Sequence, residues 1–219
     1  MKTKTVLSIV TGVLLVAAVL VGLVLALIST PRKTTRTYLK DLQKKDIYGA
    51  AALTTDPDAK SNQIFDLSLL DEFGHTAKQF HENLGAKLTD FDWSIVKCEK
   101  QGDTATVTVK VDTYSFEKLI DTALEYLSEH KTNAVDAMAA ARSHETASGA
   151  YETLDPFFQE LDRTLAGLTE KNAHKEVRLT LKKTDGVWKL QPPGRPLFDA
   201  VSGGAYSDLE QVLQSGTGR

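Results

Sequence analysis

The first hydrophobic region of this chain is a long run without charge. Residues 6–28 contain no charged side chain and lie between Lys4 and Arg32. As an α-helix this run would extend over roughly 35 Å, whereas the hydrocarbon layer of a bilayer is about 30 Å thick. The pattern predicts that residues 1–30 form an N-terminal transmembrane anchor, which contacts the lipid bilayer through residues 6–28.

A cleaved signal peptide is the main alternative for this run. The apolar region of a signal peptide is usually about 7 to 15 residues long and precedes small residues at the cleavage site. Here the run is longer and ends in the bulky Leu27 and Ile28, which favours a retained signal anchor. Cleavage after Ala26 remains an alternative. A lipid-modified cysteine is not expected, because the single cysteine of the chain is Cys98.

Helical spacing follows the run. Apolar residues recur at steps of three and four between residues 34 and 53, on both sides of a polar break at residues 44–46. This spacing predicts two short helices that meet at a bend. Pro31 is expected to end the membrane helix, and Thr34 or Thr35 is expected to cap the next helix.

After a further helix predicted over residues 64–84 and interrupted at Gly74, the spacing changes to two. Apolar and polar residues alternate over residues 91–95 and 104–112, and again over residues 176–190, which predicts two antiparallel hairpins of half-buried strands. The expected turns are Gly102 with Asp103 and Asp185 with Gly186. The apolar face of this sheet is predicted to comprise Phe91, Trp93, Ile95, Val107, Val109, Val111, Val177, Leu179, Leu181, Trp188 and Leu190.

A block of helical spacing separates the two hairpins. An amphipathic helix is predicted over residues 116–127, and an alanine-rich helix over residues 132–142. Asp155 and Pro156 form an N-cap and first-turn pair, which predicts that another helix begins there. After the last strand, a short helix is expected around residues 209–213.

Helices followed by a curved antiparallel sheet with one apolar face form an α+β arrangement. The pattern of residues 34–53 and the strand, Asp-Gly turn and tryptophan strand of residues 176–190 resemble the nuclear transport factor 2-like superfamily. More narrowly, the chain resembles membrane-anchored domains of unknown function from Gram-positive envelopes. The resemblance implies a cone-like domain over residues 31–191, followed by a flexible C-terminal tail with a short helix over residues 192–219. The helical insertion at about residues 115–171 departs from the superfamily and is a candidate to cap or fill the mouth of the cone.

Charge and motifs narrow the possible chemistry. The net charge of −3, from 26 basic and 29 acidic residues, provides no overall basic field for nucleic acid. The five histidines show no zinc-binding spacing and the one cysteine cannot build a thiolate site, so neither metal nor cofactor is predicted. Cys98 is interpreted as a buried or half-buried structural thiol, and Asp92 and Asp112 as solvated strand carboxylates. No catalytic motif is found, and no catalytic residue is predicted.

The candidate ligand-binding residues are Trp93 and Trp188. Enzymes of the superfamily place a carboxylate, a histidine or a tyrosine in the concave pocket, whereas the concave face predicted here carries no titratable group. Two indoles on that face would either line a ligand pocket or fill the core beneath the inserted helices.

The sequence thus predicts a single-pass, membrane-anchored binding or interaction protein of a bacterial cell envelope. An extracytoplasmic position of the C-terminal domain follows from the resemblance, because basic residues flank the run on both sides. Another membrane or cell-wall component is a possible partner. One alternative is a small-molecule-binding enzyme or sensor with a pocket between the sheet and the inserted helices; another is an accessory subunit of a larger membrane complex.

Overall fold

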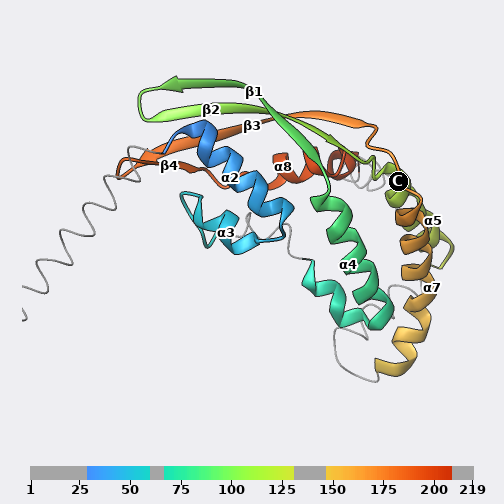
Figure 1. Cartoon of the computed structure of the whole chain (residues 1–219). Coiled ribbons are helices and arrows are strands. Elements are labelled where there is room, and N and C mark those ends of the chain that lie inside the picture. Colours follow the sequence, from blue (N-terminus) through green and yellow to red (C-terminus); the bar gives the residue numbers. More distant parts are fainter. Residues whose placement is uncertain (1–28, 60–66, 131–146, 209–219) are drawn as a thin grey trace, which may run out of the picture.

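The computed structural model describes residues 29–59, 67–130 and 147–208 (Figure 1). Helices and strands combine into an α+β fold with one four-stranded antiparallel sheet. In chain order the elements are α2 (Pro31–Gln43), α3 (Ile47–Ala52), the 3-10 helix η2 (Ser68–Phe73), α4 (His75–Thr89), β1 (Asp92–Gln101), β2 (Thr104–Thr113), α5 (Glu117–Glu129), α7 (Ala147–Ala166), β3 (Ala173–Thr184), β4 (Val187–Leu190) and α8 (Gly194–Val201).

The two short helices predicted after the apolar run are confirmed, but α2 begins earlier than expected. Thr30 is its N-cap and accepts a hydrogen bond from the Lys33 N–H at 3.2 Å, so the prediction of a cap at residue 34 or 35 was wrong. Pro31 begins the helix because its fixed φ suits the first turn, where its missing N–H costs no hydrogen bond. The Asp46 side chain then caps α3.

The sheet has the strand order β1-β2-β3-β4, and both predicted hairpins are present. Asp185 and Gly186 have φ values of 51° and 81°, as expected for a tight turn that joins two twisted strands. A register shift between Ile95 and Lys97 introduces a bulge in β1. Beyond it, Cys98 lies opposite Val107 and packs against the core, which confirms a half-buried thiol.

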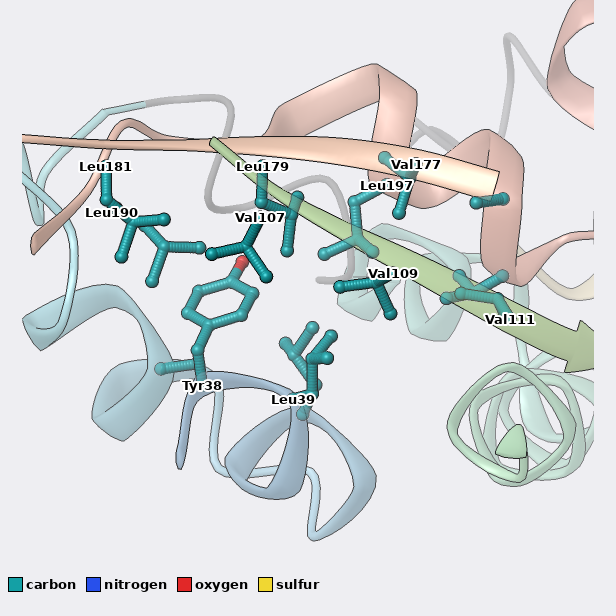
Figure 2. Close-up of a cluster of buried hydrophobic side chains, with 14 of the residues drawn as sticks. Tyr38, Leu39, Val107, Val109, Val111, Val177, Leu179, Leu181, Leu190 and Leu197 are labelled. Atoms are coloured by element: carbon teal, nitrogen blue, oxygen red, sulfur yellow. The ribbon is translucent and has the colours of Figure 1, made fainter. Parts of the chain in front are cut away.

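One face of the sheet is covered by α2 and α8. Figure 2 shows Tyr38 and Leu39 of α2 pointing toward valines and leucines of the strands, with Leu197 of α8 beside them. The valines at positions 107, 109 and 111 of β2 are 0% exposed. The predicted apolar face is confirmed, since all of its residues belong to this first core or pack against it: Phe91, Trp93, Ile95, Val107, Val109, Val111, Val177, Leu179, Leu181, Trp188 and Leu190.

The helical insertion forms a second core with the preceding helices. α5 and α7 pack together, and α7 also packs on α4. Their shared interior includes Phe80, Phe158 and Leu165. Figure 1 shows α4, α5 and α7 grouped at one end of the sheet, whereas α2 and α8 lie over its apolar face. The spacing of apolar residues in the insertion predicts a buried face but does not specify which surface covers that face.

Two element boundaries differ from the predictions. α7 begins at Ala147 and continues through Pro156, instead of beginning at Asp155. The segment after residue 191, predicted as a flexible tail, begins with the packed helix α8, in which Leu197 and Val201 are 0% exposed. The helices predicted at residues 132–142 and around 209–213 lie outside the described residues.

The predicted membrane anchor, residues 6–28, also lies outside the described residues. Among the residues that are described, no helix combines the length and apolar character needed to cross a bilayer.

Candidate functional site

The two predicted site residues, Trp93 and Trp188, lie at opposite ends of the sheet. Through the strand pairing, Trp93 is aligned with Lys175 of β3, whereas Trp188 lies opposite Lys183. These two β3 positions are about eight residues apart, which corresponds to roughly 26 Å along a strand. The indoles therefore do not line one common pocket.

Each tryptophan instead joins a helix to the sheet. The Trp93 indole donates a hydrogen bond to Gln43 Oε1 at 3.1 Å, and Gln43 Nε2 donates to the Phe91 carbonyl at 2.6 Å, which ties the end of α2 to β1. Trp188 is 6% exposed, and its carbonyl accepts a hydrogen bond from the Thr34 hydroxyl. Trp188 also borders a small cavity of about 170 Å³ beside the first turn of α2.

A polar cluster lies where the sheet meets the second core. Asp90 accepts hydrogen bonds from the Tyr114 hydroxyl at 2.6 Å and from Lys171 Nζ at 2.8 Å. Lys171 also donates to Asp92 at 3.1 Å, and Lys87 Nζ lies 4.2 Å from the centroid of the Tyr114 ring. The cluster therefore links the end of α4, the end of β2 and the segment before β3.

The charges of this cluster are fixed by its own contacts. Hydrogen bonds from Lys171 and Tyr114 lower the pKa of Asp90, and the bond to Asp90 raises the pKa of Tyr114. Although burial acts to lower the pKa of Lys171, hydrogen bonds to Asp90 and Asp92 outweigh it and raise this pKa. All three shifts move the pKa away from neutrality, which favours a role in joining the two cores over proton transfer.

The strand carboxylates predicted to be solvated lie beside this cluster. The Asp92 and Asp112 side chains are 73% and 32% exposed. Asp112 contacts His174 Nδ1 at 2.5 Å and Lys110 Nζ at 3.1 Å, and hydrogen bonds from these two residues lower its pKa. Within the described ranges, no group of three or more histidine, cysteine, aspartate and glutamate side chains is arranged to hold a metal ion.

A cavity between the α2–α3 turn and α4 has the composition of a ligand site. Its volume is about 280 Å³, close to the lower limit for small-molecule pockets, and its walls combine apolar side chains with a histidine, a lysine and a glutamate. His81 Nδ1 lies 2.7 Å from Asp71 Oδ1. Because an ionised carboxylate only accepts hydrogen bonds, Nδ1 carries the proton and Nε2 is the acceptor in the neutral ring. The lining residues are Leu42, Lys45, Ile47, Leu67, His81, Glu82, Gly85, Leu88 and Thr89.

Sequence reasoning missed the pairing of His81 with Asp71. The two residues belong to α4 and η2, and Gly74 between these helices has a φ of 102°, which sets the direction of the chain. Residue spacing contains no signal for this angle. Only the interruption of helical spacing at Gly74 was visible in the sequence.

Comparison with known proteins gives one distant neighbour. No family model and no curated protein match this chain. Among solved structures, the chain is similar to a candidate lipoprotein (ycdA) from Bacillus subtilis, with 14% sequence identity and a TM-score of 0.35. The similar region covers 59% of this chain and 38% of that protein. The chain therefore spans well under two thirds of its neighbour's length.

Proposed function

We propose that this chain is a single-pass membrane-anchored protein of a bacterial cell envelope, and that its folded domain binds a partner instead of catalysing a reaction. The observation that carries the proposal is the filled concave face of the sheet. Tyr38 and Leu39 of α2 occupy the position where an enzyme with this kind of sheet would hold its substrate, and they are 2% and 0% exposed.

The chemistry of the filled face supports binding over catalysis. The one titratable group of α2 on this face is the Tyr38 phenol, and burial raises its pKa. The phenol therefore stays neutral across the physiological range. The filled face of the sheet therefore stabilises the fold. A partner binds to the outer surface of the domain.

The run of residues 6–28 supports the anchor, because it is long enough to span a bilayer and contains no charge. Anchoring confines the domain to a surface, which raises its effective concentration for partners on the same membrane. We assign the domain to the outer side of the membrane and its sheet, with α2 and α8, to the cone of the nuclear transport factor 2-like superfamily. Both assignments come from the resemblance of residues 34–53 and 176–190.

Alkaline extraction of bacterial membranes containing the full chain tests the anchor. We expect the chain to stay in the pellet, and the double variant Val16→Arg with Leu20→Arg to be released, because each charge is costly inside the hydrocarbon. The matched control places arginine at Tyr48 and Val96, which are 89% and 55% exposed, and should remain in the pellet. Release of the unmodified chain would contradict the proposal.

Protease treatment of intact protoplasts tests the assigned side. Digestion of the domain before lysis is expected. Digestion only after lysis would place the domain in the cytoplasm.

A small-ligand sensor is the second candidate, and the cavity beside His81 favours it. Apolar walls with the Lys45 ammonium group suit a small apolar carboxylate. A Cβ at Gly85 meets no atom within 4 Å, so Gly85→Leu should fill the cavity, whereas Gly85→Ala should leave most of it open. Thermal stabilisation by benzoate that persists in Gly85→Ala and is lost in Gly85→Leu would support the sensor. Equal melting temperatures with and without benzoate would favour the binding protein.

A further inference from the structure

The first described residues are bonded directly to the edge of the sheet. The Ser29 hydroxyl accepts a hydrogen bond from the Trp188 N–H at 3.0 Å, and the Thr34 hydroxyl donates to the Trp188 carbonyl at 3.1 Å. Ser29 immediately follows the apolar run that ends at Ile28. Because these bonds fix the start of α2 against β4, little free chain separates the run from the domain.

Both hairpin turns lie at this same end of the domain. The Lys183 N–H donates a hydrogen bond to the Asp103 carbonyl at 2.7 Å, which joins β3 to the turn between β1 and β2. Lys100 Nζ lies 5.7 Å from the centroid of the Trp188 ring. Figure 1 shows the start of α2 and the two turns together at one end of the sheet.

This end of the domain, called the basic end below, carries a concentration of positive charge. Its exposed basic residues are Arg32, Lys33, Arg36, Lys100, Lys182 and Lys183. Within residues 29–59, 67–130 and 147–208, none of these six side chains forms a salt bridge.

The carboxylates at the basic end do not balance this charge. Asp103 and Asp185 lie in the two turns, and nearby Glu99 is paired with Lys97 at 2.8 Å. By contrast, Lys110 and Lys171, near the other end of the sheet, are both paired with aspartates. Six exposed basic side chains without a salt bridge among the described residues thus lie where the apolar run joins the domain.

We propose that the basic end docks on the anionic lipid headgroups of the membrane that holds the anchor, so that the domain lies against the bilayer in one fixed orientation. This inference rests on the proposed anchoring by residues 6–28. If Ile28 lies at the hydrocarbon boundary, Arg32 and Lys33 fall at headgroup level. Arg36 lies only about 6 Å farther along the helix than Arg32, which is less than the Debye length of about 8 Å at physiological salt.

Anionic lipid fits this surface better than a point ligand. The basic residues come from α2 and from both hairpins and surround the chain entry, as a planar layer of charge requires. A lysine or arginine near an anionic bilayer raises the binding constant by a factor of about five. Several such residues beside an anchor are therefore enough to keep the domain bound to the bilayer surface.

Lysine acylation of the full chain in vesicles tests the proposal. The chain is reconstituted in phosphatidylcholine, or in phosphatidylcholine mixed with phosphatidylglycerol, and the rate of modification at each lysine is measured by mass spectrometry. We expect Lys33, Lys100, Lys182 and Lys183 to react several-fold more slowly on the mixed vesicles, and the difference to vanish at high salt. The exposed lysines at positions 44, 78 and 118 serve as internal controls and should react equally on both vesicles.

A charge-neutralised variant distinguishes docking of the basic end from a general slowing of lysine acylation near the membrane. Replacing Lys100, Lys182 and Lys183 with glutamine should lower the docking equilibrium by about a hundredfold and restore fast modification of Lys33. The matched control replaces Lys44, Lys78 and Lys118 with glutamine and should leave the protection of Lys33 unchanged. Equal rates at Lys33 on both vesicle types in the unmodified chain would overturn the proposal.

Flotation of the same samples distinguishes this proposal from the anchor. Co-flotation with pure phosphatidylcholine, without lysine protection on mixed vesicles, would refute docking and leave the anchor intact. Flotation and protection only on mixed vesicles would support the basic end and refute the anchor. Flotation with neither would refute both.

Discussion

Two neighbouring threonines in α2 differ in their hydrogen bonding. The Thr34 hydroxyl donates to the Trp188 carbonyl at 3.1 Å, whereas the Thr35 hydroxyl, 0% exposed, has no hydrogen-bond partner within the described residues. A buried hydroxyl without a partner lowers stability, because it gives up its hydrogen bonds to water.

Valine at these two positions should therefore have opposite effects. Thr35→Val is expected to raise the free energy of unfolding by about 1 kcal/mol, and Thr34→Val to lower it by about 1 kcal/mol. Urea unfolding of the two variants and the parent measures both values. Shifts of the same sign would contradict the bonding described for α2.

The Asp90 cluster predicts how stability depends on pH. The pKa of Asp90 in the folded state lies below its unfolded value, so its contribution is complete above about pH 4 and is lost as the pH falls through the folded pKa. The pKa of Tyr114 is raised, so its contribution is complete below about pH 10 and is lost as the pH rises through the folded pKa.

Asp90→Asn should reduce the decrease in the free energy of unfolding at acid pH. Tyr114→Phe should reduce the corresponding decrease at alkaline pH. Unfolding free energies measured across the pH range test both expectations. If Asp90→Asn leaves the acid limb of the curve unchanged, the cluster does not join the two cores as described.

Residue patterns predicted burial better than they predicted neighbours. The alternation of residues 91–95 and 104–112 identified the core face correctly, because period-two spacing in a half-covered sheet has a direct physical meaning. The bulge after Ile95 could not be read, since it depends on hydrogen-bond register. Trp93 and Trp188 are far apart because they lie near the starts of β1 and β4, which run in opposite directions, and the residue pattern did not specify this strand order.

At the scale of elements, α7 conflicts most clearly with local sequence signals. Asp155 followed by Pro156 is a common start for a helix, yet α7 already extends from Ala147. Inside a helix, proline removes one backbone hydrogen bond and its ring presses on the preceding turn. The helix is therefore expected to lose stability at this position.

Pro156→Ala distinguishes the two possible starts of α7. If the helix runs through this position, the substitution should increase the free energy of unfolding, by up to about 3 kcal/mol. If the helix instead began at Asp155, alanine would be neutral or slightly destabilising. Chemical unfolding together with helix content from circular dichroism separates these outcomes.

The insertion and α8 show that the packing of a helix was not predicted by the residue pattern. β2 ends at Thr113 and β3 begins at Ala173, with α5 and α7 between them. The packing of α7 against α4 was not readable, because an amphipathic helix specifies only that one face is covered. The sequence predicts a flexible tail from residue 192, because a proline-rich stretch ends the strand and a glycine-rich segment follows. α8 is instead stabilised by packing against β2 and β3.

At the scale of the whole molecule, the domain consists of two adjoining cores with polar contacts between them. The first core fills the concave face of the sheet, and the second lies among α4, α5 and α7. Among the described residues, α2 and α8 cover the apolar face of the sheet. The proposed partner surface is on the outside, where the six basic residues of the basic end lie beside the apolar run.

The intact mass of the chain recovered from the membranes of producing cells tests the central proposal most directly. A retained anchor predicts a membrane-bound species whose mass includes residues 6–28 and which only detergent releases. A species that begins after Ala26 and is recovered from the culture medium would contradict the account.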